Sequence, residues 1–130
     1  MILEIDPRSG VPIYTQIMRQ VERLILAGHL QEGAQLEQVR SVAARLKVNP
    51  MTISKAYSLL EREGFLERRR GVGLFVAPMR KSAQERFRGQ VIDEAFQKAA
   101  ASAIQMQLSE DDAVALLRSQ FRHLASRKES

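Results

Sequence analysis

The sequence predicts a mainly α-helical protein with one small β-hairpin, and two features of the apolar pattern lead to this prediction. Apolar residues recur every three or four positions along most of the chain, the spacing that gathers them on one face of a helix. Near the middle, two short apolar runs flank a glycine-containing segment, which is the pattern of a hairpin. The 130 residues are 45% hydrophobic and 27% charged, proportions that suit a folded globular protein.

The first predicted helix begins at Pro12 and ends at Gly28. Proline suits the first turn because the N–H groups there have no partner within the helix, and glycine commonly follows the last turn. After a loop around Gly33, a second short helix is predicted from Val39 to Leu46, where apolar residues again repeat at helical spacing.

The third predicted helix follows the short turn Lys47-Val48. Asn49-Pro50 is a strong start signal, because the asparagine side chain can accept from first-turn N–H groups while proline takes the first helical position. Gly64 ends the helix. Its predicted core face is Ile53, Ala56, Tyr57 and Leu60, which leaves Met51, Thr52, Ser54, Lys55 and Ser58 on the other faces.

A basic hairpin is predicted next. The strands are Phe65-Leu66-Glu67-Arg68 and Leu74-Phe75-Val76, and the glycines of Arg69-Arg70-Gly71-Val72-Gly73 allow the positive φ of a tight turn. Residues 40 to 70 hold eight bases and three acids, and the other 99 residues hold twelve of each, so this window carries the whole net charge of +5. A basic surface that faces a polyanion gives this uneven pattern. The alternative is a basic face that meets only solvent.

The composition changes after Pro78. An alanine-rich helix is predicted from about residue 80 to 105, and a second helix begins after Ser109, which forms a capping-box pattern with Asp112. Residues 80 to 126 therefore predict a helical hairpin that dimerises, and ordinary packing on the same chain's first domain is the alternative. The residues expected in the dimer interface are Phe87, Val91, Ala95, Phe96, Ala99, Leu116, Leu117 and Phe121.

Three short helices, a tight turn between the second and third, and a basic hairpin make a winged helix-turn-helix. The predicted fold is mainly α with a small β-hairpin, with this DNA-binding type of domain in residues 1–78 and a short two-helix dimerisation region in residues 79–130. From about residue 11 to 77 the chain resembles the GntR family of bacterial transcription regulators, and its short tail resembles the YtrA subfamily. The motifs that carry the resemblance are Pro12-Ile13-Tyr14-Thr15-Gln16-Ile17, Val39-Arg40-Ser41-Val42-Ala43, Asn49-Pro50-Met51-Thr52-Ile53-Ser54-Lys55-Ala56-Tyr57, Leu60-Glu61-Arg62-Glu63-Gly64-Phe65-Leu66 and Gly71-Val72-Gly73-Leu74-Phe75-Val76.

The resemblance implies a homodimeric, cytoplasmic repressor that binds an inverted-repeat DNA operator near a transporter operon. Arg40 matches the family arginine that touches DNA, and a guanidinium can bind guanine O6 and N7 together or clamp a phosphate. Arg70 and Gly71 match the wing tip, which in the family reaches the minor groove. Lys55 is expected on a phosphate, and Asn49 is either a contact or only a helix cap. The residues expected to contact DNA are Arg40, Asn49, Met51, Thr52, Ser54, Lys55, Ser58, Arg69, Arg70 and Gly71.

Two positions depart from the family pattern. The family usually has Leu-Pro-Ser before its Val-Arg, but this chain has Leu36-Glu37-Gln38, so the serine cap is absent and Glu37 would repel phosphate if it faced DNA. Met51 stands where many relatives carry a hydroxyl or a base, and its thioether offers only an apolar contact, such as one to a thymine methyl. The base sequence that is read is therefore open.

No feature predicts an enzyme, and no cofactor or metal is expected. Cysteine is absent, His29 and His123 lack metal-ligand spacing, and no nucleophile has a base nearby in sequence. No apolar run approaches the roughly 20 residues of a membrane-spanning helix. The alternatives to a DNA-binding regulator are a protein-interaction module that uses the helical hairpin and an RNA-binding winged helix. The sequence leaves open whether a small-molecule effector binds between the domains, at the dimer interface or not at all.

Overall fold

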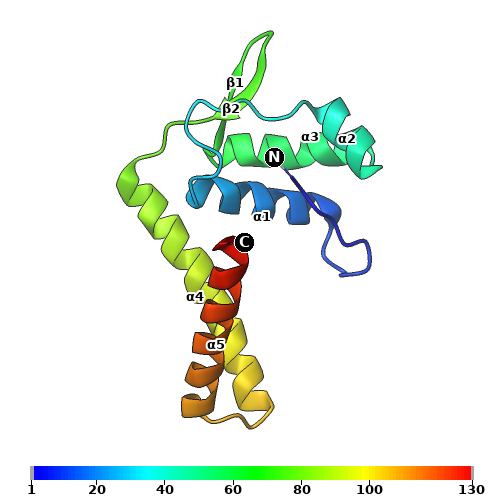
Figure 1. Cartoon of the computed structure of the whole chain (residues 1–130). Coiled ribbons are helices and arrows are strands. Elements are labelled where there is room, and N and C mark those ends of the chain that lie inside the picture. The colour runs from blue at the N-terminus through cyan, green and yellow to red at the C-terminus, as the bar shows by residue number, and fades with distance from the viewer. Residues whose placement is uncertain (1, 130) are drawn as a thin grey trace. The chain divides into compact units, whose positions relative to one another are not determined.

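The computed structural model describes residues 2–129, which form five helices and one two-stranded sheet (Figure 1). The chain divides into two compact units, Met1–Arg88 and Gly89–Ser130. The predicted fold class, mainly helical with a small β-hairpin, is confirmed. In chain order the elements are α1 (Ile13–Leu26), α2 (Val39–Leu46), α3 (Pro50–Arg62), β1 (Leu66–Arg69), β2 (Gly73–Val76), α4 (Lys81–Gln105) and α5 (Glu110–Glu129).

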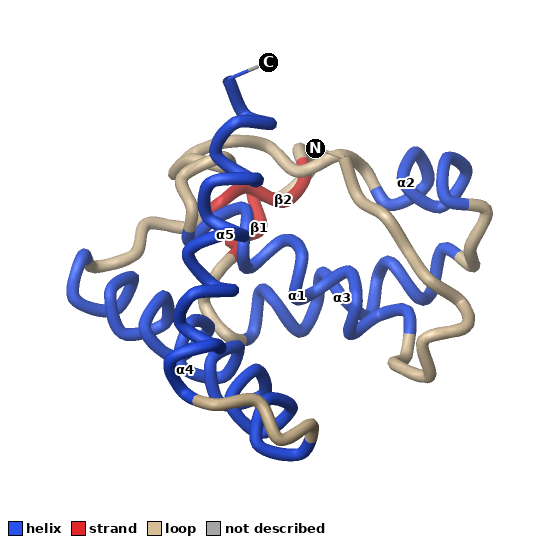
Figure 2. The backbone as a smooth tube through the Cα atoms, turned by 60° about the horizontal axis from the view of Figure 1, so that its bottom comes forward, coloured by secondary structure: helices blue, strands red, loops and turns tan. Residues whose placement is uncertain are grey.

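The core of the first unit forms where α3 packs against both α1 and α2 (Figure 2). The predicted core face of α3 is confirmed, because Ile53, Ala56, Tyr57 and Leu60 are all buried. Burial of such side chains holds the short helices together, since each large apolar side chain contributes about 1.5 to 3 kcal/mol. The other helices contribute Ile17, Val21 and Ile25 of α1 and Val42 of α2.

The wing is the antiparallel pair of β1 and β2, with Arg69 opposite Gly73 next to the tip. Residues 33–36 run along β2 and bond to it through backbone hydrogen bonds of 2.8 to 2.9 Å. The turn at the tip contains Gly71 with a φ of 75°, a backbone conformation that glycine adopts without steric cost. The wing is thereby braced at its base, and its basic tip projects from the domain.

Two glutamines of α1 hold the N-terminal segment against the helix, a feature that no local pattern predicts. Gln16 accepts from the Asp6 N–H (2.8 Å) and donates to the Asp6 carbonyl (2.9 Å). Gln20 forms the same pair of bonds with the backbone of Glu4. An amide side chain matches a peptide group because it carries both an acceptor and donors. These bonds hold Leu3 in place in the core, where it is buried.

The first turns of α4 belong to the first unit. The ring of Phe87 packs at a tilt against Phe65, with 5.2 Å between the ring centroids. Arg88 Nη2 donates to the carbonyl of Leu26 at the end of α1 (2.9 Å). Phe87, which the sequence predicts at a dimer interface, therefore packs within its own chain and is half-buried.

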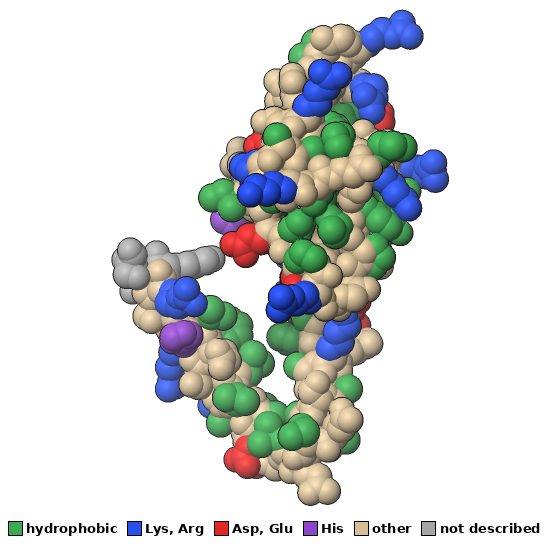
Figure 3. Space-filling view, turned by 90° about the vertical axis from the view of Figure 1, so that its right-hand side faces the viewer, with side chains coloured by type: hydrophobic (Ala, Val, Ile, Leu, Met, Phe, Trp, Pro, Cys, Tyr) green, Lys and Arg blue, Asp and Glu red, His purple; other side chains and the backbone are tan. Residues whose placement is uncertain are grey.

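The second unit is a hairpin of α5 and the part of α4 after Arg88 (Figure 1). Ser109 Oγ accepts from the Asp112 N–H (3.1 Å), which confirms the predicted cap of α5. The two helices pack against each other much less than α1 and α3 do, and no side chain in residues 89–127 is buried. Hydrophobic side chains lie exposed along both helices (Figure 3). No helix among the described residues is long and apolar enough to cross a membrane.

A pair of carboxyl groups joins α1 to the end of α3. The pKa of Glu22 is raised from its ordinary 4.5 to about 7, chiefly by burial and also by a hydrogen bond to Glu63 and by the negative charge of Glu63. Arg19 and Arg23 act in the opposite direction. The folded protein therefore binds a proton at Glu22 more tightly than the unfolded chain does. The stability that this proton supports is present below pH 4.5 and is lost as the pH rises through 7.

Replacing Glu22 by glutamine should make the stability of the protein less dependent on pH. We expect Glu22→Gln to raise the free energy of unfolding at pH 8 by about 1 kcal/mol, less than the full pKa shift would give because the group is only half-buried. At pH 4 the variant and the wild type should be nearly equal. Urea unfolding at both pH values measures the effect, with the exposed Glu32→Gln as the control. An equal pH dependence of stability in Glu22→Gln and the wild type would contradict the prediction.

Candidate nucleic-acid interface

The outward face of α3 is the centre of the candidate interface. Asn49 Oδ1 accepts from the Met51 N–H (2.9 Å), so Asn49 is a helix cap whatever else it contacts. The buried face of the helix fixes the orientation of the outward face, and Met51 near its start is 77% exposed. Of the ten residues predicted to contact DNA, nine are exposed and Thr52 is half-buried. They come from α2, the turn before α3, α3 itself and the wing.

The start of α2 presents Arg40, which is exposed and forms no ion pair with any residue in the described part of the chain. Gln38 is the N-cap residue but gives no side-chain cap, so first-turn N–H groups remain open to solvent or a ligand. The Tyr57 hydroxyl donates to the Glu37 carbonyl (2.9 Å), which ties the start of α2 to α3. Burial raises the pKa of Tyr57 well above its ordinary value, so the hydroxyl keeps its proton as a donor.

The carboxylate of Glu37 adds no isolated negative charge to this face. Its two oxygens accept from Arg45 Nη2 at 2.9 and 3.1 Å. The ion pair is close to neutral as a whole, so it reduces the repulsion of phosphate that Glu37 alone would cause. The departure from the family pattern at this position is therefore matched by a basic partner eight residues along the chain.

The three consecutive arginines of the wing have different surroundings. Arg68 pairs with Glu61 at 3.2 Å. Arg69 pairs with Glu67 at 3.4 Å, and its guanidinium carbon lies 4.0 Å from the centroid of the Phe75 ring. Arg70 is exposed at the tip and has no ion pair among the residues that the structure describes. Arg70 is therefore the wing arginine with most freedom to reach a ligand.

Lys55 is held by an aromatic ring. Its Nζ lies 4.0 Å from the ring centroid of Tyr14, which belongs to the first turn of α1. A ring face attracts a cation without cancelling its charge. Sequence reasoning missed Tyr14 because no local pattern links two helices that far apart in the chain. The one available signal was its place in the motif Pro12-Ile13-Tyr14-Thr15-Gln16-Ile17.

Comparison with known proteins identifies the family. Residues 13–76 match the family model described as bacterial regulatory proteins, gntR family. The solved structure of YtrA from Sulfolobus acidocaldarius, a GntR-family transcription factor, is matched over 75% of this chain and 99% of its own length, with 34% identity and a TM-score of 0.58. This chain belongs to the GntR family. The resemblance predicted from the sequence is thus confirmed.

Further relatives agree with the GntR assignment. The HTH-type transcriptional repressor YtrA of Bacillus subtilis is 44% identical over 81 residues, which cover 62% of this chain and 62% of that relative's length. A GntR family transcriptional regulator from Listeria monocytogenes matches 88% of this chain and 98% of its own, with 25% identity and a TM-score of 0.74. AraR(DBD), solved in complex with operator ORX1, matches 59% of this chain and 95% of its own, with 26% identity and a TM-score of 0.52. These relatives are named as a transcriptional repressor, a transcriptional regulator and a transcription factor.

The turn between α2 and α3 of this GntR protein contains a strained lysine. Lys47 has a φ of 57°, in the left-handed region that costs a residue with a Cβ atom energy. We expect Lys47→Gly to stabilise the protein by about 0.5 to 1 kcal/mol, because glycine relieves the strain but loses more backbone entropy on folding. Urea unfolding measures the change. Lys47→Ala is the control, since it removes the charge and keeps the strain; equal stability of the two variants would contradict the prediction.

Proposed function

We propose that this GntR-family protein regulates transcription by binding double-stranded DNA as a homodimer. The observation that carries the proposal is the exposed basic face formed by the start of α2, the outward side of α3 and the wing tip. All ten residues predicted to contact DNA lie in residues 13–76, the segment that matches the family. AraR(DBD), which shares the fold, was solved on its operator. The basic side chains around the wing are visible in Figure 3.

The roles of the individual residues follow from their chemistry. The major groove of B-DNA is about 12 Å wide and admits one α-helix, so we propose that the outward face of α3 enters it. Arg40 has no ion pair with the described residues, and it contacts a guanine edge or a phosphate. Lys55 contacts a phosphate. Arg70 at the wing tip reaches the adjacent minor groove, whose negative potential attracts arginine. Met51, Thr52, Ser54 and Ser58 face the bases and sugars between these charged contacts.

The exposed apolar side chains of the second unit support a homodimer. Phe96 is 52% exposed and Phe121 is 66% exposed, with Leu116, Leu117 and Leu124 exposed around them. Exposed apolar surface on this scale is usual at protein interfaces, because its removal from water is worth about 25 cal/mol per Å². A second copy of the chain offers the same apolar faces. The proposed interface consists of the residues predicted from the sequence except Phe87, which packs against Phe65 of its own chain.

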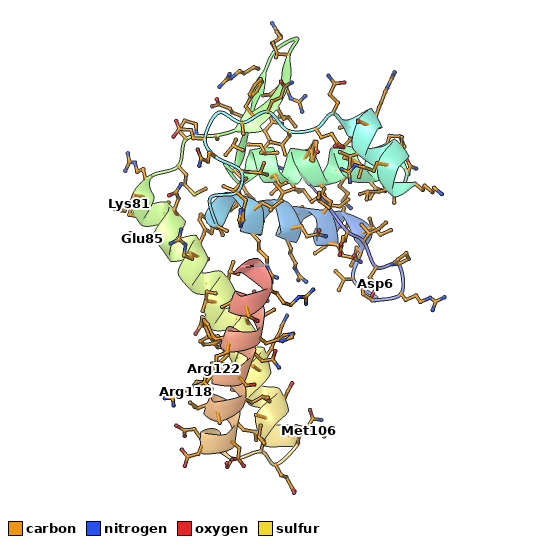
Figure 4. The ribbon with its side chains drawn as sticks, viewed as in Figure 1. Asp6, Lys81, Glu85, Met106, Arg118 and Arg122 are labelled. Carbon is orange, nitrogen blue, oxygen red and sulfur yellow. The ribbon has the colours of Figure 1, made fainter. Side chains whose placement is uncertain are left out.

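The charges of α5 favour an antiparallel pairing with the partner's α5. Its first turn is acidic, with Glu110, Asp111 and Asp112. Arg118 and Arg122 follow later in the helix and project from the same side of it (Figure 4). In a fully overlapping antiparallel pair the acidic start of each helix lies beside the partner's last turn, where the sequence places Arg127 and Lys128, and Arg118 and Arg122 lie near the middle of the pair. A twofold axis between the two copies produces this arrangement.

A twofold dimer implies a twofold operator. Two copies of α3 would enter successive major grooves, so we propose an inverted repeat with half-sites about 34 Å apart, one helical turn. The relative from Bacillus subtilis is named a repressor. We therefore propose repression in which the dimer covers promoter DNA, with a nearby transporter operon as the first target to examine.

Binding to the DNA upstream of the protein's own gene tests the proposal. In fluorescence anisotropy, we expect affinity for the operator-containing duplex to exceed that for a shuffled duplex by on the order of 10³-fold. Sedimentation should give two chains per duplex. Equal affinity for both duplexes would contradict sequence-specific regulation and favour a protein-interaction module. Tighter binding to single-stranded RNA than to either duplex would favour an RNA-binding winged helix.

A further inference from the structure

The contact between Tyr14 and Lys55 joins α1 to the outward face of α3. Lys55 is exposed and its Nζ lies 4.0 Å from the centroid of the Tyr14 ring, which is half-buried. We propose that Tyr14 is a positioning residue for DNA binding, whose ring holds the Lys55 ammonium in place for a phosphate. This inference rests on the proposed DNA-binding function and adds to it a residue outside the helix-turn-helix and the wing.

The kind of group that holds the Lys55 side chain matters, because the lysine must keep its positive charge available for a phosphate. Arg45, Arg68 and Arg69 of the same unit each pair with a glutamate. A carboxylate holds a basic side chain in place, but it also offsets the positive charge of that side chain and repels phosphate. Lys55, in contrast, forms no ion pair with any carboxylate in the described part of the chain. The Tyr14 ring thus fixes the ammonium while the full positive charge persists.

Fixing the side chain before DNA arrives reduces the entropic cost of binding. A lysine side chain has four rotatable bonds and loses much of its freedom when it docks on one phosphate. Since the ring restricts this freedom in the free protein, less remains to be lost on binding. The ring and not the hydroxyl performs this role, so phenylalanine should replace tyrosine without loss.

A double-mutant cycle on the full-length protein tests the inference. The variants are Tyr14→Leu, Tyr14→Phe, Lys55→Met and the double variant Tyr14→Leu/Lys55→Met, with Lys98→Met in α4 as a charge-matched control. The ligand is a random-sequence DNA duplex, because a phosphate contact does not depend on base sequence. Anisotropy at several salt concentrations gives the affinity and its salt dependence. Thermal unfolding of each variant establishes that it is folded.

We expect Lys55→Met to weaken binding on the order of tenfold and to reduce the salt slope by about 0.9 for each lost phosphate contact, which is about 1.8 for the two Lys55 side chains of a dimer. Tyr14→Leu should weaken binding about 2- to 5-fold. Tyr14→Phe should bind like the wild type, and Tyr14→Leu should cause no further loss once Lys55 is methionine. In NMR spectra, the Lys55 side-chain protons should lose their upfield ring-current shift in Tyr14→Leu and keep it in Tyr14→Phe.

Other outcomes separate failure of the inference from failure of the proposed function. If the wild type binds no duplex, the proposed function fails. If Tyr14→Phe loses as much affinity as Tyr14→Leu, or if Tyr14→Leu weakens binding equally in the Lys55→Met background, Tyr14 contacts DNA directly and the positioning role is overturned. If Lys55→Met leaves DNA affinity unchanged, the phosphate contact and the positioning role fail together while DNA binding stands.

Discussion

Replacing Leu117 and Phe121 together by glutamate should convert the protein into a monomer and weaken operator binding by about a hundredfold or more. Both side chains are exposed on α5, at 42% and 66%, in a unit without buried side chains in residues 89–127. Four glutamates placed across a twofold interface would be desolvated without partners, which is strongly unfavourable. A monomer then contacts one half-site at a time. It loses the high effective concentration at which the second subunit of a dimer binds the second half-site, which raises affinity by about 10²- to 10⁴-fold.

The matched control places the same two charges on the other side of the helix. Ser119 and Ser126 lie about half a turn away from Leu117 and Phe121 around α5. Ser119→Glu/Ser126→Glu should remain dimeric and bind operator like the wild type. Sedimentation equilibrium measures the oligomeric state and anisotropy measures the affinity. A Leu117→Glu/Phe121→Glu protein that stays dimeric would place the interface elsewhere. A variant that is monomeric but keeps full affinity would contradict the proposal that the dimer binds both half-sites together.

The elements that the sequence predicts well are those with local signals. Asn49-Pro50 predicts the start of α3, and Asn49 does cap it. Helical spacing predicts its core face, because a helix buries whichever side carries its apolar residues. Ser109 predicts the cap of α5 in the same way. The hairpin follows from two apolar runs and the glycines between them, and the observed strands, Leu66–Arg69 and Gly73–Val76, differ from the predicted ones by one residue at their ends.

The features that the sequence does not predict depend on contacts between distant segments. The Gln16 and Gln20 bonds to the N-terminal backbone join residues up to 16 positions apart, and glutamine carries no positional signal. Three consecutive arginines look alike in sequence, yet the wing leaves only Arg70 without an ion pair among the described residues. Apolar periodicity indicates which side of a helix is buried but not what that side packs against. The sequence therefore does not predict that Phe87 packs on Phe65 of its own chain.

Arg40→Ala should weaken operator binding by about 1 to 3 kcal/mol, on the order of 5- to 150-fold, and should relax the preference at one base pair in each half-site. Arg40 is exposed at the start of α2, and its backbone position is fixed because Tyr57 ties the preceding residues to α3. Arg40→Lys keeps the charge but loses the planar fork of donors that matches guanine O6 and N7. If Arg40 reads a base, the lysine variant should therefore lose specificity while it keeps much of its affinity.

Point-substituted operators show which of the two contacts Arg40 makes. Anisotropy titrations of wild type, Arg40→Ala and Arg40→Lys against each single-base-pair variant give a specificity profile, and Arg62→Ala, at the far end of α3, is the matched control. A base contact gives one position in each half-site at which the wild type discriminates and Arg40→Ala does not. A phosphate contact weakens binding to every operator equally and lowers the salt slope by about 0.9 for each chain of the dimer, about 1.8 in all. Unchanged affinity in Arg40→Ala would remove Arg40 from the interface, and α3 and the wing would then provide the contacts to DNA.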